Sequence, residues 1–337
     1  MITLPEIIER DKRPPSVTVY MICYNHEKYL DEAMHGVLMQ KTDFPVNIVI
    51  HDDASTDKSA EIIRRYASEN PNITAILEET NFYQNGKSFF LIVLPYFTGK
   101  YVAWCECDDF WIDEHKLQEQ INYLESNPDC IAVYSNTLPV NKFSQYDESV
   151  RTFITLSRPE GDYSRHKILG TIGQLASFVS RNFWKFMTRE EIDFYTHVKA
   201  NGDEKIIAMC LRLGRVHHFS REFAAHRKVI DEGDSWSARM ARLDKYECCR
   251  LSVKQKPELY RMLAYFFGRD YKRRYVDIMF DELISRVRFH KSIIKDAELD
   301  SCYQLKNIPI YAYVAFPFYF MYRVLRKIAK TLQPNKF

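Results

Sequence analysis

Short apolar runs alternate with amphipathic segments along the first part of the chain. The runs are rich in β-branched residues and are bounded by polar clusters, which predicts buried strands at residues 17–23, 46–50, 73–77, 101–105 and 131–134. Between them, apolar residues recur at helical spacing, which predicts helices at residues 27–39, 55–67, 88–97 and 113–124. Strands that are apolar on both faces are typical of a parallel sheet covered by helices. The pattern therefore predicts an α/β fold with a doubly wound, mostly parallel sheet.

This alternation weakens after about residue 140. Beyond it we expect a strand at 178–180, a helix at 203–213, a strand at 216–219 and helices between 254 and 296. One domain is expected over residues 1–240, with a first half at 16–140 and a second half at 141–240. A helical C-terminal extension is expected over residues 241–337.

Composition and charge narrow the class of protein. The chain is 46% hydrophobic and 27% charged with a formal net charge of +2, so a sizeable core is expected and nucleic acid is not an expected partner. The spacing of the eight cysteines forms no zinc motif, so reduced, buried thiols in a cytoplasmic protein are expected. The charged N-terminal segment lacks the apolar core of a signal peptide.

An acidic cluster follows the predicted strand at 101–105. Glu106, Asp108 and Asp109 are three carboxylates within four residues, and they repel one another unless a positive group lies among them. Mg²⁺ or Mn²⁺ with oxygen ligands fits this demand and could bridge to a ligand's phosphates. The alternative is a solvated acidic turn before the next helix, but the aromatic pair Phe110-Trp111 favours a binding site.

A second polar cluster, His51 to Asp57, follows the strand at 46–50. Asp52 or Asp53 could accept a hydrogen bond from a ring N–H of a base. The alternative is a helix N-terminus with Ser55 as its cap, and both interpretations can hold together.

At this point the sequence resembles a known family. Residues 16 to about 136 resemble the family 2 glycosyltransferases of bacterial surface-polysaccharide synthesis, which have the A-type glycosyltransferase fold. Several pieces match in order: VTVYMICYNHEKYLDEAMHGVLMQ, IVIHDDASTDKSAEIIRRY, Asn81 with Gly86, and YVAWCECDDFWIDEHKLQEQINYLESNPD. The resemblance implies a nucleotide-sugar donor, expected to be UDP-linked, a Mn²⁺ or Mg²⁺ cofactor, and inversion at the anomeric carbon.

The resemblance also implies roles for residues of the first half. Tyr24 and Asn25 would border the nucleoside, and Asp52 or Asp53 would bind the base. Residues 16–140 would then hold the donor and metal, and residues 141–240 the acceptor.

For the metal, the resemblance implies Asp108 as the principal ligand. This sequence departs from the family pattern with Glu106 in the first acidic position and with Cys107 where a small residue is usual. Glu106 could therefore contact the metal, a ribose, or neither.

An inverting transfer needs a general base for the acceptor hydroxyl. In the family this base is an acidic residue at the start of a later helix, and Asp203 matches best, with Glu204 as the second candidate. The alternative for Asp203 is a simple helix cap.

A later basic motif of the family resembles His226-Arg227-Lys228. Arg227 could pair with diphosphate oxygens, and His226 could contact the metal or a phosphate, although a lone histidine is more often structural. The sequence lacks the Gln-x-x-Arg-Trp motif of processive members, which favours a single-addition enzyme.

The C-terminal tail suggests contact with a membrane surface. Residues 307–322 carry no charge and are rich in aromatic residues, and a run of cations follows: Arg323, Arg326, Lys327, Lys330 and Lys336. The apolar stretch is shorter than the ~20 residues that span a bilayer, so peripheral attachment to the cytoplasmic face is expected. A glycan or lipid-linked acceptor would suit this location. The alternative is a core element followed by a solvated tail.

Two other functions stay open from the residues alone. A sugar-phosphate nucleotidyltransferase also binds nucleotide and metal, but it usually carries a Gly-rich basic loop, which residues 24–27 do not form. A non-catalytic, membrane-associated binding or scaffold protein is the other alternative, against which the intact Asp108 and Asp203 argue.

Overall fold

The structure of this chain is a computed structural model. It describes residues 2–83, 85, 88–150, 158–163, 172–229, 236–243, 247, 258–259 and 261–267. The chain divides into two compact units, Met1–Ala238 and Arg239–Phe337. In the second unit, the described residues 258–259 and 261–267 are helical. The rest of the helices expected up to residue 296 lies outside the described residues.

The first unit is built on one sheet, whose strands follow the order β3-β2-β1-β4-β8-β6-β9-β5, with β7 paired to β9. The strands are β1 (Val17–Cys23), β2 (Val46–Asp52), β3 (Ile73–Leu77), β4 (Tyr101–Trp104), β5 (Phe110–Trp111), β6 (Cys130–Val140), β7 (Gly161–Tyr163), β8 (Val179–Arg181) and β9 (Arg215–Arg227). Strands β1, β2, β3, β4, β6 and β9 run in one direction, and β5, β7 and β8 run against them. This mostly parallel sheet confirms the predicted fold class.

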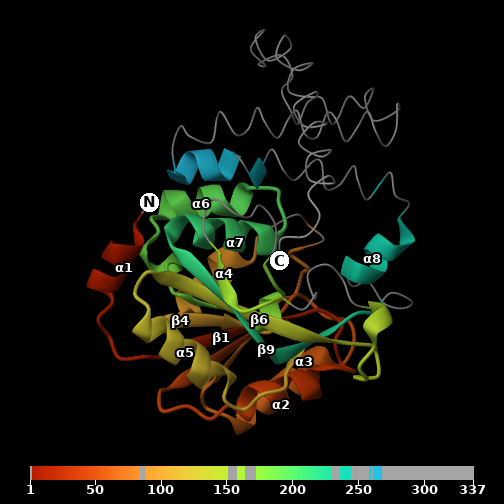
Figure 1. The fold of residues 1–337 in the computed structure, drawn as a ribbon. Coiled ribbons are helices and arrows are strands. Elements are labelled where there is room, and N and C mark those ends of the chain that lie inside the picture. Colours follow the sequence, from red (N-terminus) through yellow and green to blue (C-terminus); the bar gives the residue numbers. More distant parts are fainter. Residues whose placement is uncertain are drawn as a thin grey trace, which may run out of the picture. The chain divides into compact units, whose positions relative to one another are not determined.

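Helices cover both faces of the sheet. The helices of the first unit are α1 (Leu4–Arg10), α2 (Leu30–Leu38), α3 (Ser59–Glu69), α4 (Phe90–Val93), α5 (Lys116–Ser126), α6 (Arg189–His197) and α7 (Gly202–Leu213), and α8 (Trp236–Arg242) crosses the boundary between the two units. Short 3-10 turns lie at Leu94–Tyr96, Glu148–Val150, Leu175–Ser177 and Trp184–Phe186. Figure 1 shows α2, α3 and α5 on one face of the sheet and α4, α6 and α7 on the other. This arrangement is the doubly wound one.

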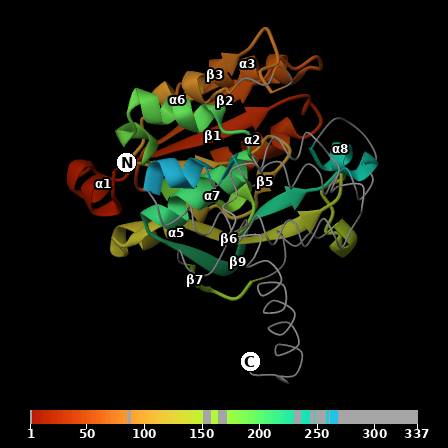
Figure 2. The same ribbon diagram turned by 90° about the horizontal axis from the view of Figure 1, so that it is seen from above.

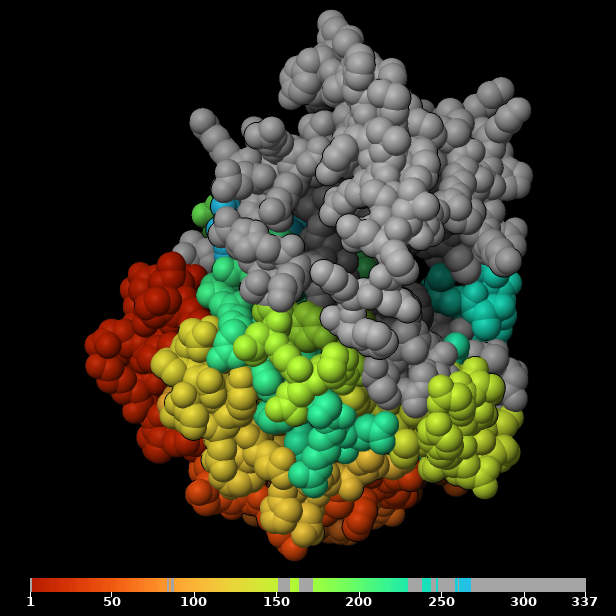
Figure 3. Space-filling view, in the orientation of Figure 1, coloured from red at the N-terminus to blue at the C-terminus, as the bar shows by residue number. Residues whose placement is uncertain are grey.

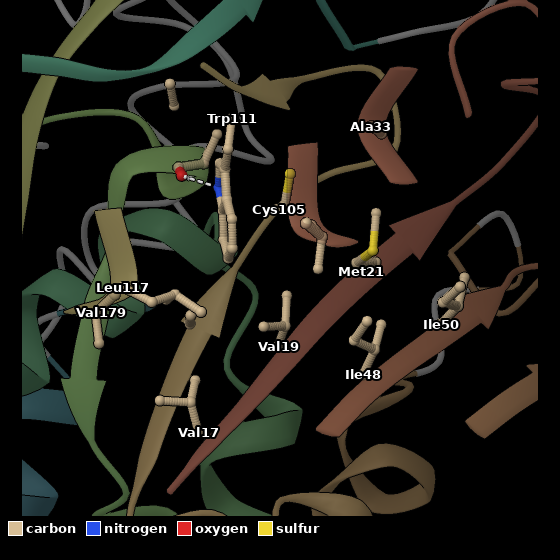
Figure 4. Close-up of a cluster of buried hydrophobic side chains, with 14 of the residues drawn as sticks. Val17, Val19, Met21, Ala33, Ile48, Ile50, Cys105, Trp111, Leu117 and Val179 are labelled. Carbon is tan, nitrogen blue, oxygen red and sulfur yellow. Dashed lines mark hydrogen bonds between the residues drawn. The ribbon is translucent and has the colours of Figure 1, made fainter. Parts of the chain in front are cut away.

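Successive side chains of β1 point to opposite faces of the sheet and so pack into two separate cores. Val17, Val19 and Met21 point into an aliphatic cluster with the helices α2, α3 and α5, as Figure 4 shows. Tyr20 points to the opposite face, where its ring meets Trp104 edge-on at 4.9 Å. Because both faces of the strand are buried, the near-continuous apolar sequence of β1 is explained.

Several element boundaries differ from the sequence prediction. The helix expected from residue 27 begins at Leu30, and the one expected from residue 55 begins at Ser59. In both cases the residues before the helix bond to a neighbouring loop instead of entering the helix. The elements α1, α6, β5 and β7 were missed, and β6 and β9 are far longer than expected.

Within the described residues, no helix has both the length and the apolar character needed to cross a membrane. The tail at residues 307–337, on which the expected membrane contact depends, lies outside the described residues.

Candidate active site

The loops that follow β1 and β2 meet at the carboxyl edge of the sheet. These strands are parallel neighbours in register, with Cys23 opposite Asp52, and Figure 2 shows β3, β2 and β1 in adjacent positions. Asn25 donates its N–H to Ser55 Oγ at 2.8 Å, and its Oδ1 accepts from the N–H of Thr56 at 2.8 Å. The two loops are therefore joined before any ligand binds.

This junction is held in an uncommon backbone conformation. Asn25 has a φ of 57° and Ala54 a φ of 60°, both in the left-handed region. Asparagine tolerates that region, whereas alanine rarely adopts it. Strain of this kind clusters at functional sites, which is consistent with a binding role for these two loops.

Asp52 and Asp53 are buried and already bonded to their own loops. Asp52 accepts two hydrogen bonds from Ser55, one from the N–H at 3.0 Å and one from the Ser55 hydroxyl at 2.5 Å. Asp53 accepts from the N–H groups of Phe82 at 2.6 Å and Tyr83 at 3.1 Å. Both carboxylates thus shape the edge of the site, and direct contact of either one with a base stays a prediction, as does the contact of Tyr24 and Asn25 with a nucleoside.

The acidic cluster lies at the end of β4, beside the β1 loop. The N–H of Cys107 donates to the carbonyl of Ile22 at 3.0 Å, and the N–H of Asp109 closes a turn onto the carbonyl of Glu106 at 3.0 Å. The side chain of Asp108 is 28% exposed, whereas that of Asp109 is 2% exposed. The three carboxylates therefore have different surroundings, and Asp108 is the open one.

Strand β9 closes the other side of this cluster. Phe110 lies opposite Ala225 in the β5–β9 pair, which brings the end of β9 to the motif. Asp109 accepts from the N–H of Arg227 at 2.8 Å and lies 3.2 Å from Nδ1 of His226. Burial lowers the pKa of His226, but the carboxylates of Asp109 and Asp108 outweigh burial and leave that pKa above its ordinary value.

The first turn of α7 adds a fourth carboxylate to the cluster. Asn201 is the N-cap and the helix begins at Gly202, so Asp203 is not the cap residue. Burial raises the pKa of Asp203, and Asp109 raises it further while His226 lowers it. Burial also raises the pKa of Glu106, and Asp203 is the carboxylate that adds most to that effect. The structure thus brings Asp203 and the acidic motif together; Glu204, beside it in the same turn, is half-buried.

Arg227 is placed differently from what a phosphate ligand requires. Its side chain is fully buried, and its guanidinium donates to Ser144 and to the carboxylate of Glu32. It also donates to the main-chain carbonyl of Asp108 at 2.5 Å. The diphosphate contact expected for Arg227 stays a prediction that this environment does not favour.

Sequence reasoning missed one histidine of the site. Nε2 of His26 lies 3.8 Å from the carboxylate of Asp108, and its buried Nδ1 has no hydrogen-bond partner. Burial lowers the pKa of His26, but Asp108 and the Cys23 thiol outweigh it and raise that pKa to about 9. His26 follows β1 and belongs to the sequence piece VTVYMICYNHEKYLDEAMHGVLMQ that resembles the family. Its position directly after a buried strand was the signal that could have identified it.

The residues at this edge fit a divalent cation that is bound partly by the protein and partly by the phosphates of a substrate. Within the described part of the chain, no three His, Cys, Asp or Glu side chains form a complete metal site. Mg²⁺, however, is usually held by one or two carboxylates and completed by waters and substrate phosphates. Asp108 is open, and burial and the neighbouring carboxylates raise the pKa of Glu106. Asp108 with Glu106 or His226 could supply that smaller set of ligands.

Comparison with known proteins gives one family and several relatives. A family model described as glycosyl transferase family 2 matches residues 18–186. An uncharacterized protein of Mycobacterium tuberculosis is 41% identical over 114 residues, which cover 34% of this chain and 32% of that protein. The minor teichoic acid biosynthesis protein GgaB of Bacillus subtilis is 24% identical over 234 residues, which cover 65% of this chain and 23% of GgaB. The matches to these curated relatives thus span a third or less of the relatives' length.

A solved structure shares the fold. The crystal structure of S. aureus TarS residues 1–349 in complex with UDP-GlcNAc aligns with a TM-score of 0.52 and 18% identity, over 79% of this chain and 80% of that one. At this identity the likeness concerns the fold alone.

Proposed function

Because this chain belongs to glycosyl transferase family 2, we propose that it transfers a sugar from a nucleotide-sugar donor to a hydroxyl group of an acceptor. The proposed donor is UDP-linked, and the proposed acceptor is a glycan or a lipid-linked glycan of a bacterial surface polysaccharide. The proposed stereochemical course is inversion at the anomeric carbon.

One observation carries this proposal: carboxylates from separate elements converge at the carboxyl edge of the sheet. Glu106 and Asp108 come from the end of β4, and Asp203 comes from the first turn of α7. Burial and neighbouring carboxylates raise the pKa values of both Glu106 and Asp203. Perturbed carboxylates at this edge of an α/β sheet are typical of a catalytic site.

The donor would lie across the joined loops after β1 and β2. Tyr24, Asn25 and either Asp52 or Asp53 are the proposed contacts with the nucleoside. The proposal of a UDP sugar is supported by the UDP-GlcNAc complex of TarS, which shares the fold.

Asp108 would hold a divalent cation, with Glu106 and His226 as further candidates. When bound, Mn²⁺ or Mg²⁺ would neutralise the nucleoside diphosphate that departs. His26 and His226 lie beside the carboxylates, so they supply local positive charge of their own when protonated.

Asp203 is the proposed general base, with Glu204 as the alternative. A base must be deprotonated and within reach of the acceptor hydroxyl. Burial raises the pKa of Asp203, which makes its carboxylate a stronger proton acceptor than an exposed one.

The acceptor and the location of the enzyme are proposed on separate grounds. GgaB is named for minor teichoic acid biosynthesis, which supports an acceptor on a surface polymer. We propose residues 141–240 as the acceptor half and peripheral contact of the C-terminal tail with the cytoplasmic face of the membrane.

The test is turnover of a nucleotide-sugar panel by the purified chain, with and without Mn²⁺ or Mg²⁺. Release of nucleoside diphosphate from one member, dependent on the metal, is the expected result. Release of inorganic pyrophosphate from a nucleoside triphosphate, dependent on an added sugar phosphate, would instead indicate a nucleotidyltransferase. Binding without turnover across the panel would contradict the enzyme proposal.

A further inference from the structure

We propose that Arg227 is a positioning residue: it clamps the metal-binding motif to helix α2 and to the turn at residues 141–146, and it does not contact the donor diphosphate. This inference rests on the proposed function, because it assigns Asp108 to the metal. It concerns a side chain whose place in the sequence suggested a phosphate ligand.

The first support is the set of hydrogen bonds that Arg227 makes. Nη1 donates to the main-chain carbonyl of Asp108 at 2.5 Å. Nη2 donates to Ser144 Oγ at 2.8 Å and also to the carboxylate of Glu32. The guanidinium therefore ties together three segments that lie far apart in the sequence.

The second support is the burial of the guanidinium. It lies over the ring of Tyr29, with Cζ 4.3 Å from the centroid, and 5.2 Å from the centroid of Phe110. The side chain of Arg227 has 0% exposure, and its Nε, which has no hydrogen-bond partner among the described residues, is also buried. A diphosphate could reach the guanidinium only by displacing the carboxylate of Glu32 or the ring of Tyr29 or Phe110. The charge of Arg227 is thus compensated within the protein.

The third support is that the turn held by Arg227 has hydrogen bonds of its own. Oδ1 of Asn141 accepts from the N–H groups of Phe143 at 2.9 Å and Gln145 at 3.2 Å. Ser144 has a φ of 61°, and its hydroxyl donates to Glu32 at 2.7 Å while it accepts from Arg227. A preformed turn is a suitable fixed point against which to hold another loop.

This turn lies at the surface, although the Arg227 side chain that holds it is buried. Phe143 is 70% exposed and Tyr146 is 58% exposed. Residues 141–150 form the yellow-green part of the surface at the right of Figure 3. The clamp therefore links an exposed turn to the metal-binding motif through one buried side chain.

The consequence concerns the orientation of Asp108. The bond from Nη1 fixes the main chain of Asp108, and the bond from the N–H of Arg227 to Asp109 at 2.8 Å fixes the next residue. Groups that orient a metal ligand are worth roughly 10- to 100-fold in metal affinity or activity. Loss of the clamp should therefore weaken the metal while the nucleotide contacts stay intact.

The principal test is Arg227→Lys, which keeps the charge but cannot form the two-armed set of bonds. In the presence of UDP, Mn²⁺ binding measured by titration calorimetry should weaken by about 10- to 100-fold. In metal-free protein, the ratio of UDP affinity to uridine affinity should stay at the wild-type value. A fall in that ratio with Mn²⁺ binding unchanged would show a phosphate ligand and overturn the proposal.

Two further variants separate positioning from general loss of structure. Ser144→Gly removes the hydroxyl but tolerates the positive φ, so it should weaken Mn²⁺ binding in the same direction and less than Arg227→Lys does. Combined with Arg227→Lys it should add less than its separate effect, because both variants break one network. Simple additivity of the two effects would contradict a shared clamp.

Arg221→Lys is the matched control, since Arg221 lies on the same strand but is exposed and pairs with Asp113 and Glu119. It should leave Mn²⁺ binding unchanged. If wild-type protein binds neither UDP nor Mn²⁺, the proposed function itself fails. If wild-type protein binds both and Arg227→Lys matches it, only the clamp fails.

Discussion

At the scale of single residues, the acidic motif divides its work between neighbouring carboxylates. Asp109 is 2% exposed and is bonded to β9, whereas Asp108 is 28% exposed and its carboxylate lies 3.8 Å from Nε2 of His26. Spacing alone cannot separate these two residues, because both follow the same strand. The structure makes Asp108 the better candidate for a metal ligand and Asp109 a support.

Asp108→Ala is therefore expected to abolish metal-dependent release of nucleoside diphosphate. The fold should survive, because the carboxylate of Asp108 forms no hydrogen bond among the described residues and one repulsive charge is removed. Turnover in Mn²⁺ and the melting temperature of metal-free protein are the two measurements. A variant that keeps the wild-type rate in Mn²⁺ would remove Asp108 from the metal site.

Asp203→Asn is expected to lower turnover by about 10²-fold or more, the scale of a lost general base. Donor affinity should change little, because the base faces the acceptor. The wild-type rate should also fall as the pH drops through the raised pKa of Asp203, since only the deprotonated form accepts a proton. The measurements are kcat against pH and donor binding, with Glu204→Gln as the comparison. A variant with normal kcat and weakened donor binding would contradict the assignment.

The sequence identified residue types at the site better than it identified their partners. Asp52 and Asp53 were found from a local polar cluster and Asp203 from the family resemblance, and all three lie at the carboxyl edge of the sheet or beside it. Glu32 and Ser144 were missed because their contacts with Arg227 join positions 195 and 83 residues apart. No local pattern marks such a contact.

At the scale of elements, the buried strands were predictable and the helix starts were not. The strands at 17–23 and 73–77 have the predicted bounds because uninterrupted apolar runs define them. The start of α3 is shifted because Ser55 and Asp57 bond to the β1 loop. The side chains of Ser55 and Asp57, which could cap a helix that begins at residue 55, instead accept hydrogen bonds from the N–H groups of Asn25 and Glu27.

A close approach between α2 and β5 explains a glycine inside a helix. A Cβ atom on Gly36 would lie 2.7 Å from both N and O of Trp111. Gly36→Ala is therefore expected to destabilise the protein by about 1–3 kcal/mol, although alanine favours helix. Gly202→Ala in α7 is the control, because nothing lies within 4 Å of its added Cβ. Chemical denaturation measures both, and equal stabilities of the two variants would show that the helix can shift at no cost.

Helix α5 carries a fully buried lysine on its core face. Nζ of Lys116 lies 4.2 Å from the centroid of the Trp111 ring and donates to Gln120 at 2.8 Å. Burial lowers its pKa from 10.5 to about 7. Between these two values the unfolded chain binds a proton that the folded chain lacks, so this residue makes stability rise with pH across that window.

Lys116→Met is accordingly expected to gain stability over wild type near pH 7, since it keeps the apolar stem and removes the buried charge. The gain should shrink toward pH 10, where the wild-type lysine pays little for burial. Denaturation of both proteins at the two pH values measures the difference. Lys12→Met, at an exposed position, should show no such trend. A gain that stays constant with pH would show that packing, and not the charge, causes it.

At the scale of the whole molecule, the sequence predicted the parallel half of the sheet and not the mixed half. Strands β1 to β4 alternate with helices in the chain, so their order follows from pattern and connection rules. Strands β5, β7 and β8 are two or three residues long and run against the rest. Their pairing with β4, β6 and β9 depends on contacts that are distant in the sequence. The proposed site draws on both parts of the chain, because Asp108 follows β4 and Asp203 lies in the first turn of α7.

Removal of residues 307–337 is expected to release the chain from anionic vesicles. The uncharged, tyrosine-rich residues 307–322 would contribute burial at the interface, and the cations that follow would add roughly 1 kcal/mol each near an anionic surface. Salt screens the cationic part but not the apolar part, so the 337-residue chain should bind best at low salt and retain some binding at high salt. Sedimentation with vesicles of anionic and of neutral lipid measures this, and donor hydrolysis by the shortened chain serves as the control for folding. A chain that ignores anionic vesicles would contradict the membrane contact, and a shortened chain that unfolds would place the segment in a core instead.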